Sequence, residues 1–496
     1  MLGNALIDMY AKCGKISLAF QVLEELPVRD VVSWNTLISV YSQHNRGHEA
    51  FNCFIQMQNE GLSPDPVTFT CILKACSITR AIEKGKEIHN QIVDRGLLEK
   101  DSVLGNALVD MYAKCGLLNK ALEVCEELPL QDVVSWSAII AAYAQQGQAH
   151  EALNCFERMK SAGVEPNVVT LICTLKACGS AGALDNGKQI HEEILSNGLL
   201  WKDPMLGNSL VDMYAKCGML EEAHDMHNKI ADRDVVTWTS LITGYAEHGY
   251  AEEALESYER MQDEAISPDA FIISHTLTAC GSLGAFFKGC EIHLDLVKKN
   301  LENDVSIGEC LVDMYGKCGS PIMAENVFNN LPVQTTSCWN VLISGFAQLG
   351  ENSEVFCLLQ RMRREGVCPD LITFLNILNV CNYSGLIYEA QMWFETINND
   401  YDFVPALEHF TCIVDMLGHA GQVGKAVNMI EKIPFHPNVV IWHTMLGACQ
   451  KEAHLELGVF AFEQALAVNE MDAAAYVSLS NICIHDSIPF RDSKDD

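Results

Sequence analysis

The sequence lacks the features that would identify an enzyme, a metalloprotein or a disulfide-stabilised protein. Its 496 residues contain 21 cysteines but no CxxC motif, and no tight group of His and Cys has the spacing of a zinc site. We therefore expect no metal, no other cofactor and no enzymatic activity. The cysteines are predicted to be small buried hydrophobic residues of a protein in a reducing compartment.

Long apolar runs and a basic charge are also missing. No apolar run approaches the ~18 residues that cross a bilayer, so no membrane partner is expected. Residues 1–10 (MLGNALIDMY) are neither basic nor rich in Ser, unlike a signal or transit peptide. The 33 Lys and Arg residues are outnumbered by 65 Asp and Glu residues, a formal net charge of −32. Any binding of nucleic acid must therefore come from a locally built surface.

Internal repetition is the dominant feature of what is present. The motif LGNALVDMYAKCG at residues 104–116 has close copies that begin at residues 2, 206 and 307. Two further motifs, VVSWNTLISVYSQ from residue 31 and LKACSITRAIEKGKEIH from residue 73, recur with the same period of about 102 residues. Self-similarity at a fixed period is typical of an array of small units rather than of separate globular domains.

Each block of about 102 residues contains three segments with the pattern of a helical hairpin. The complete block divides into residues 66–101, 102–132 and 133–167, which are 36, 31 and 35 residues long. In the last segment a helix-compatible run ends at Gly147, and a second stretch places its apolar residues at helical spacing. One hairpin cannot bury its own apolar face, but stacked neighbours can. The sequence therefore predicts an all-α fold, an α-solenoid of helix-turn-helix repeats forming a right-handed superhelix.

Segments of 31, 35 and 36 residues in strict rotation, with VVSWN, GKEIH and GNALVDMYAKCG, resemble the plant pentatricopeptide repeat (PPR) proteins. They are most similar to the subclass in which standard, long and short repeats alternate. The resemblance divides the chain into a partial short repeat at 1–30, an array at 31–438 whose closing short repeat is 407–438, an incomplete C-terminal extension motif at 439–483, and a divergent tail at 484–496. We expect the chain to be truncated at both ends, without upstream repeats and a targeting peptide.

The resemblance implies a sequence-specific, single-stranded RNA-binding protein of an organelle, with one base per repeat. The subclass implies site recognition for C-to-U RNA editing, with a deaminase-domain protein and multiple organellar RNA editing factors as partners in trans. The alternatives are an organellar RNA stability, splicing or processing factor, and a tetratricopeptide-like protein–protein scaffold, although scaffold repeats keep a uniform 34-residue period. Family frequency favours the mitochondrion over the chloroplast. The HxE sequence at His191 lacks the CxxC that a deaminase needs.

In the family, two positions of each repeat specify the base, and alignment carries them over. The aligned pairs are Asn4 with Asp30, Asn35 with Asp65, Asn106 with Asp132, Ser137 with Asn167, Asn208 with Asp234, Thr239 with Asp269, Asn340 with Asp370, and Thr411 with Asn438. An Asn amide suits a pyrimidine edge, and a nearby Asp can accept from the NH₂ group and orient it. The alternative role for the first position is helix capping, but Ser33, Ser135 and Thr237 are better placed as N-caps.

The family code reads these pairs as 5′-U-U-x-U-A-x-U-G-x-x-U-x-A-3′. The long repeats are left as x, because Ile172 and Leu375 cannot form a hydrogen bond with a base. The tenth base is x because Glu309 and Thr335 replace the Asn and the Asp, and this repeat is expected to read nothing or to be relaxed.

Three further sets of residues recur at fixed places in the repeats. The apolar residues Val32, Val134 and Val236 match the family's base-stacking positions, and Ser337 interrupts this pattern. The recurring lysines are expected either to meet phosphates or to be solvated helix ends; they are Lys12, Lys114, Lys216 and Lys317. The recurring tryptophans are expected in the core rather than as stacking platforms; they are Trp34, Trp136, Trp238 and Trp339.

Overall fold

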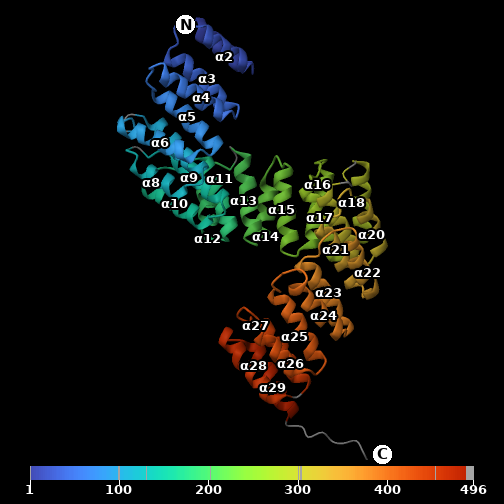
Figure 1. The fold of residues 1–496 in the computed structure, drawn as a ribbon. Helices are drawn as coiled ribbons and strands as arrows, with labels where there is room; N and C mark the ends of the chain where they lie inside the picture. The colour runs from blue at the N-terminus through green and yellow to red at the C-terminus, as the bar shows by residue number, and fades with distance from the viewer. Residues whose placement is uncertain are drawn as a thin grey trace, which may run out of the picture. The chain divides into compact units, whose positions relative to one another are not determined.

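The computed structural model describes residues 2–98, 101–129, 131–200, 203–299, 301, 304–452 and 454–486, and these residues form helices without strands (Figure 1). The helices pair into hairpins that stack on one another, which confirms the predicted α-solenoid. Among these residues, no helix combines the length and the apolar content needed to cross a bilayer.

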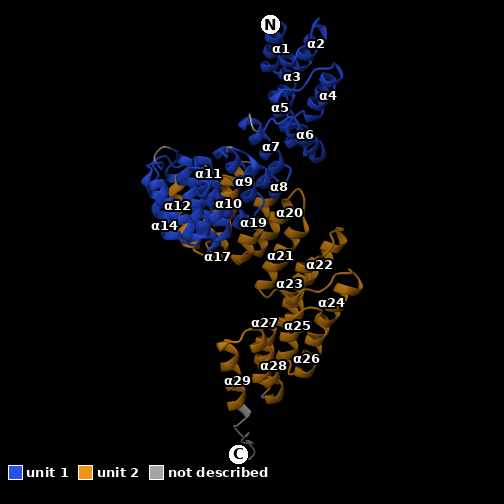
Figure 2. Cartoon of the chain, turned by 90° about the vertical axis from the view of Figure 1, so that its left-hand side faces the viewer, with its two compact units in different colours: residues 1–248, 263–266 blue, residues 249–262, 267–496 orange. Residues whose placement is uncertain are grey.

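The helices belong to two compact units, which are coloured separately in Figure 2. Unit 1 comprises residues 1–248 and 263–266. Its helices are α1 (Leu2–Lys12), α2 (Ile16–Glu25), α3 (Val31–Gln43), α4 (Gly47–Asn59), α5 (Pro66–Thr79), α6 (Ile82–Asp94), α7 (Ser102–Lys114), α8 (Leu118–Glu127), α9 (Val133–Gln145), α10 (Ala149–Ser161), α11 (Val168–Ala181), α12 (Leu184–Ser196), α13 (Pro204–Lys216), α14 (Leu220–Lys229) and α15 (Val235–Glu247).

Unit 2 comprises residues 249–262 and 267–496. Its helices, except for the last residue of the first one, are α16 (Ala251–Asp263), α17 (Ala270–Leu283), α18 (Phe286–Lys298), α19 (Val305–Lys317), α20 (Pro321–Asn330), α21 (Thr336–Gln348), α22 (Asn352–Arg364), α23 (Leu371–Ser384), α24 (Ile387–Asn399), α25 (Leu407–His419), α26 (Val423–Glu431), α27 (Val439–Lys451), α28 (Leu455–Val468) and α29 (Ala473–Asp486). The predicted tail begins inside α29, and its residues from 487 onward lie outside the described part of the chain.

The hairpin formed by α9 and α10 shows why the sequence folds in this way. Helix α9 begins after Asp132, whose carboxylate accepts from the backbone N–H groups of Val134 (3.0 Å) and Ser135 (3.1 Å). The turn passes through Gly147 at φ 74°, a left-handed conformation that favours Gly. The apolar stripe of α10 is then buried against α9: it consists of Ala152, Cys155, Phe156 and Met159. The predicted borders 66, 102 and 133 are the first residues of α5, α7 and α9.

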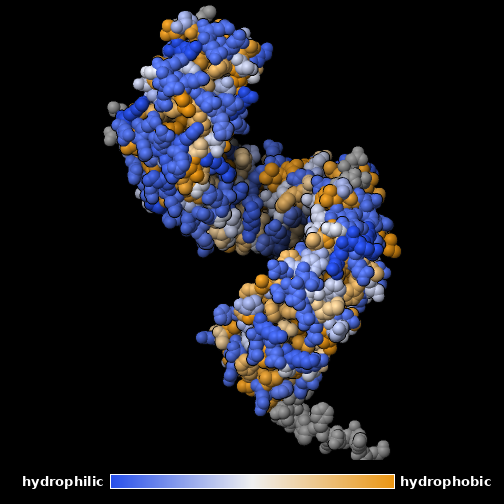
Figure 3. Space-filling model, in the orientation of Figure 1, coloured by the Kyte–Doolittle hydropathy of each residue, from blue (hydrophilic) through white to orange (hydrophobic). Residues whose placement is uncertain are grey.

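Within each unit, the first helices of successive repeats form one layer and the second helices another. The first helices pack side by side, as α3, α5, α7 and α9 do in unit 1, and each second helix packs on its own first helix. The four recurring tryptophans lie between the layers with at most 2% of their surface exposed, so their predicted core position is confirmed. The surface visible in Figure 3 is mostly hydrophilic, with hydrophobic residues scattered over each unit.

The prediction for the cysteines holds only for some of them. Cys76, Cys178 and Cys280 are buried, but the cysteines of the YAKCG or YGKCG motifs are not: Cys13 is exposed, and Cys115, Cys217 and Cys318 are partly exposed. These last three are C-caps, so each lies where the chain leaves its helix rather than within the packed layer. Each donates to the carbonyl oxygen of one of the buried cysteines, at 3.7–3.8 Å.

Candidate nucleic-acid interface

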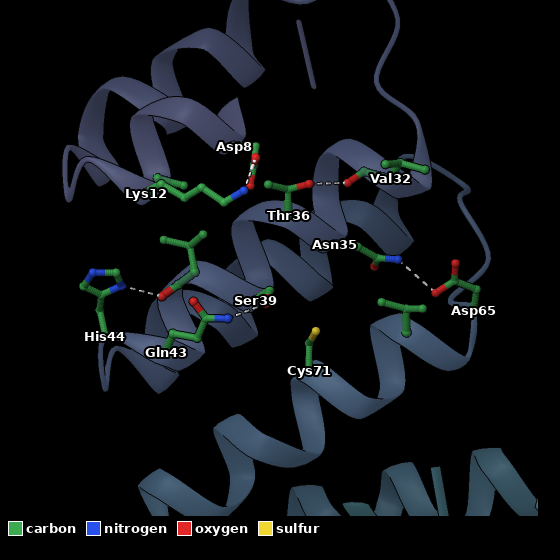
Figure 4. A pocket seen from close by; sticks show the side chains of 13 residues that line it. Asp8, Lys12, Val32, Asn35, Thr36, Ser39, Gln43, His44, Asp65 and Cys71 are labelled. Carbon is green, nitrogen blue, oxygen red and sulfur yellow. Dashed lines mark hydrogen bonds and ion pairs between the residues drawn. The ribbon is translucent and has the colours of Figure 1, made fainter. Parts of the chain in front are cut away.

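The two predicted base-selecting positions occupy fixed places in the hairpins. The first is the fifth residue of a repeat's first helix, as Asn35 is in α3, except that Asn4 is the third residue of α1. The second is the N-cap of the first helix of the next repeat, as Asp65 is for α5. Because α3 and α5 pack side by side, the two side chains meet across the repeat boundary (Figure 4).

In five repeats, the Asn amide donates directly to the Asp carboxylate. The Nδ2-to-oxygen distances are 3.2 Å for Asn4–Asp30, 2.9 Å for Asn35–Asp65, 2.7 Å for Asn106–Asp132, 3.1 Å for Asn208–Asp234 and 2.9 Å for Asn340–Asp370. These are the donor and the acceptor that the two residue types predict. The repetition of one contact in both units shows that it belongs to the repeat architecture.

A hydroxyl group fixes the other end of most of these amides. Asn35 Oδ1 accepts from Thr68 Oγ1 (2.6 Å), and the same bond holds Asn208 through Thr237 (2.8 Å). Ser135 and Thr373 serve Asn106 and Asn340 in the same way. The two bonds orient the amide, which by its valence has one further N–H and one further lone pair to offer.

The N-cap assignment made from the sequence was wrong. Asp30, and not Ser33, caps α3: its carboxylate accepts from the Ser33 N–H (2.8 Å), while Ser33 Oγ accepts from the Asp30 N–H (3.0 Å). Ser135 and Thr237 likewise lie at the third helical position, behind the caps Asp132 and Asp234. An N-cap precedes the helix with extended backbone, and Ser33 is already helical. The Asp therefore caps its own helix and orients the Asn of the preceding repeat.

Hydrogen bonds hold the pKa of three of these carboxylates below the ordinary value. Burial alone would raise the pKa of Asp65, but the hydrogen bonds from the Thr68 N–H and from Asn35 outweigh it, so the pKa lies below its ordinary value. The pKa of Asp30 is lowered mainly by the Ser33 N–H, and that of Asp234 is lowered by the bonds from Thr237 and Asn208 against the effect of burial. At neutral pH these groups are therefore acceptors only.

In the repeat at 133–167, Ser137 and Asn167 are connected through a third side chain. Ser137 Oγ donates to Val133 O (2.6 Å), so the proton of its 2.7 Å contact with Thr170 Oγ1 comes from Thr170. Thr170 Oγ1 in turn accepts from the Asn167 N–H (3.3 Å) and lies 2.9 Å from Asn167 Oδ1. Thr170 therefore bridges Ser137 and Asn167. Asn167 is also the N-cap of α11.

In the two pairs that begin with Thr, the hydroxyl likewise donates to the backbone carbonyl four residues earlier in its own helix. Thr239 donates to Val235 O (2.7 Å) and Thr411 donates to Leu407 O (2.9 Å). Their predicted partners are again N-caps: Asp269 accepts from the Ile272 N–H (2.8 Å) and Asn438 accepts from the Ile441 N–H (3.1 Å). Thr239 lies in unit 1 and Asp269 in unit 2.

The predicted stacking residues are exposed beside the pairs. Val32, Val134 and Val236 are 55–58% exposed, each at the second position of its helix. The long and short repeats place exposed apolar residues at the same position, the second of the helix. The recurrence is visible in the sequence but was not predicted; the residues are Val67, Val103, Val169, Met205, Phe271 and Ile372. Val32 and Val67 line one pocket together with Asn35 and Asp65. Figure 4 shows Val32, Asn35 and Asp65 in this pocket. The pocket therefore brings apolar side chains and the polar Asn–Asp pair to one surface.

The recurring lysines are already partnered within their own helices. Lys12 lies 2.8 Å from Asp8, and the same ion pair joins Lys114 to Asp110, Lys216 to Asp212 and Lys317 to Asp313 at 2.7–2.8 Å. Figure 4 shows the first of these pairs at the edge of the pocket. The neighbouring carboxylate therefore weakens the attraction of each lysine for a phosphate.

His191, the histidine of the HxE sequence, makes a hydrogen bond that recurs along the chain. His191 Nδ1 is hydrogen bonded to the Tyr214 hydroxyl at 2.8 Å, and His89–Tyr112 and His293–Tyr315 make the same contact in the other blocks. Burial lowers the pKa of His89 and of His191. Within the described ranges, no three His, Cys, Asp or Glu side chains come together as a metal site.

Comparison with known proteins agrees with this architecture. A family model described as "PPR repeat family" matches residues 29–77, 131–180, 233–280 and 334–382, and one described as "PPR repeat" matches residues 4–31, 106–132 and 208–235. Among Arabidopsis thaliana relatives, pentatricopeptide repeat-containing protein At2g03380, mitochondrial, is 33% identical over 97% of this chain and 70% of its own length. At3g57430, chloroplastic, is 34% identical over 97% of this chain and 55% of its own length. The chain thus spans about half of the longer relatives.

Solved structures share the fold. The pentatricopeptide repeat protein PPR10 from maize is 18% identical, with a TM-score of 0.53 over 97% of this chain and 81% of that chain. The structure of PPR10 in complex with an 18-nucleotide psaJ RNA element is 17% identical, with a TM-score of 0.59 over the same shares.

Proposed function

The chain belongs to the pentatricopeptide repeat family, and from this membership we propose that it is a sequence-specific, single-stranded RNA-binding protein. The observation that carries the proposal is the oriented Asn–Asp pair, repeated five times and flanked by exposed apolar residues. The name of a neighbouring structure, PPR10 with an 18-nucleotide RNA, supports the same ligand class.

The pocket at Asn35 supports a specific mode of binding. A base would lie between Val32 and Val67, with its Watson–Crick edge toward the remaining N–H and lone pair of Asn35. A pyrimidine edge offers the acceptor and the donor that match this amide. The Thr68 hydroxyl and the Asp65 carboxylate prevent the amide from turning over, so the order of donor and acceptor is fixed.

The more specific proposal is site recognition for C-to-U RNA editing in an organelle. It is supported by the rotation of three repeat lengths and by the resemblance of residues 439–483, which fold as α27, α28 and most of α29, to the family's extension motif. A deaminase-domain protein and multiple organellar RNA editing factors would then act in trans. The names of relatives include both mitochondrial and chloroplastic proteins, and we propose the mitochondrion with the chloroplast as the alternative.

Binding of the purified chain to the 13-nucleotide RNA 5′-UUxUAxUGxxUxA-3′ and to a scrambled RNA of equal composition tests the proposal. We expect the first RNA to bind at least about tenfold more tightly, since each well-matched base edge contributes roughly 1–3 kcal/mol. Equal affinity for both RNAs would contradict sequence-specific binding and favour a protein scaffold. Specific binding without any effect on editing in vivo would favour a stability, splicing or processing factor.

A further inference from the structure

The repeat at residues 305–335 has a different pair from its sister repeats. Glu309 takes the place of the Asn, and Thr335 takes the place of the Asp. Cys338 replaces the Ser or Thr whose hydroxyl holds the Asn oxygen elsewhere, and Ser337 replaces the exposed Val. All four changes fall on residues that contact one another within unit 2.

Three donors hold the Glu309 carboxylate in one orientation. Oε1 accepts from Thr335 Oγ1 (2.8 Å) and from Cys338 Sγ (3.2 Å), and Oε2 accepts from Ser337 Oγ (3.2 Å). Thr335 Oγ1 also accepts from the Cys338 N–H (3.2 Å), so it still caps α21. Burial raises the pKa of the Cys338 thiol, and the nearby carboxylate adds to this, so the thiol keeps the proton that it donates.

The direction of hydrogen bonding is therefore the reverse of that in the Asn repeats. There, the first position donates to the second; here, Glu309 accepts from Thr335. Each carboxylate oxygen has two lone pairs, and the three bonds leave one of them on Oε2. Where an oriented Asn offers a base one donor and one acceptor, Glu309 offers an acceptor with a negative charge.

We propose that Glu309 determines base specificity at the tenth position and selects a base with N–H donors on its Watson–Crick edge, guanine first, while rejecting uracil. This inference rests on the proposed RNA-binding function. It replaces the expectation from the sequence that this repeat reads no base or is relaxed. Guanine presents N1–H and the N2 amino group side by side, so either donor can reach the one remaining lone pair. Uracil flanks its single N–H with two carbonyl oxygens that repel a carboxylate. A carboxylate is an established acceptor for the amino groups of bases.

The test uses the whole chain and four RNAs, 5′-UUAUAAUGANUAA-3′, that differ only at N. For the wild type we expect guanine at N to bind about tenfold more tightly than uracil. Glu309→Gln keeps the size of the side chain but adds a donor and removes the charge, so this preference should fall about tenfold. Glu354→Gln removes the same charge from an exposed site on α22 and should leave the preference unchanged.

The outcomes separate this inference from the proposed function. Preference for these RNAs over scrambled RNA, with no discrimination at N or with uracil preferred, would overturn the role of Glu309 and leave RNA binding intact. Equal binding of matched and scrambled RNAs would overturn both. If Glu309→Gln fails to fold in a thermal unfolding control, the comparison of the four RNAs on the wild type still decides.

Discussion

At the scale of single residues, the Asp at each repeat boundary has two roles that can be measured separately. Asp65 caps α5 through the Thr68 N–H (2.8 Å) and orients Asn35 (2.9 Å). Asn can replace Asp in the first role, because Asn167 and Asn438 cap α11 and α27 in this chain. It cannot supply two anionic oxygens for the second role.

We therefore predict that Asp65→Asn changes the free energy of unfolding by less than ~0.5 kcal/mol, whereas Asp65→Ala lowers it by about 1 kcal/mol through loss of the cap. Both variants should discriminate less between bases at the second position of the RNA. Chemical denaturation and binding to four RNAs that vary there provide the two readouts. Normal discrimination in Asp65→Ala would mean that the Asp is a cap only.

Sequence reasoning found both residues of this pair but misplaced the cap. Alignment located Asn35 and Asp65 because their positions vary little along the chain. It assigned the cap to Ser33 because Ser is a common N-cap residue, and only the backbone reveals that Ser33 is already inside α3. The partnering of Lys12 by Asp8 was also missed, although the i, i+4 spacing is visible in the sequence.

At the scale of the helices, the His–Tyr contacts join the second helix of a long repeat to the first helix of the following short repeat. His89 on α6 contacts Tyr112 on α7, and His191 on α12 contacts Tyr214 on α13. Burial lowers the pKa of both histidines, so the folded chain resists protonation more than the unfolded chain does.

It follows that these contacts lose stability in acid. As the pH falls through the unfolded value of about 6.5, the unfolded chain binds protons that the folded chain excludes, and the free energy of unfolding decreases. We predict lower stability at pH 5.5 than at pH 7.5 in denaturant titrations. The double variant His89→Gln, His191→Gln should show a smaller difference between the two pH values. An unchanged difference would assign the pH dependence to other groups.

The helices themselves could be predicted well, because apolar spacing and Gly turns define each hairpin locally. The starts of α5, α7 and α9 agree with the predicted borders. The exposure of Cys115 could not be predicted in the same way, since it depends on how far the neighbouring repeat reaches over the end of α7. The exposed Val67 and Val103 could have been predicted, because they occupy the same position of the helix as Val32 does in the standard repeats.

At the scale of the whole molecule, charge sets the kind of binding that is possible. The net charge is −32, and the four recurring lysines are paired with Asp. If all four met phosphates, the slope of log K against log salt would be about −3 for single-stranded RNA. We predict a slope no steeper than this in fluorescence anisotropy between 50 and 300 mM salt, together with weak binding of random RNA. A slope steeper than about −5 would require a basic surface that the lysine pairs do not provide.

The central claim is that the paired residues read bases, and the repeat at 133–167 tests it most directly. Ser137→Asn with Asn167→Asp would copy the pair Asn35–Asp65, and Thr170 already stands where Thr68 holds Asn35. The new amide at position 137 could therefore donate to the new carboxylate at position 167 and accept from the Thr170 hydroxyl. Stability should change little, because sister repeats already carry these residues.

The decisive measurement is the affinity of the wild type and of this double variant for four 13-nucleotide RNAs that differ only at the fifth base. We predict that the preferred base changes from adenine to uracil, by roughly 1–3 kcal/mol. An unchanged preference in a folded double variant would mean that these residues serve the helices alone, and would contradict the account.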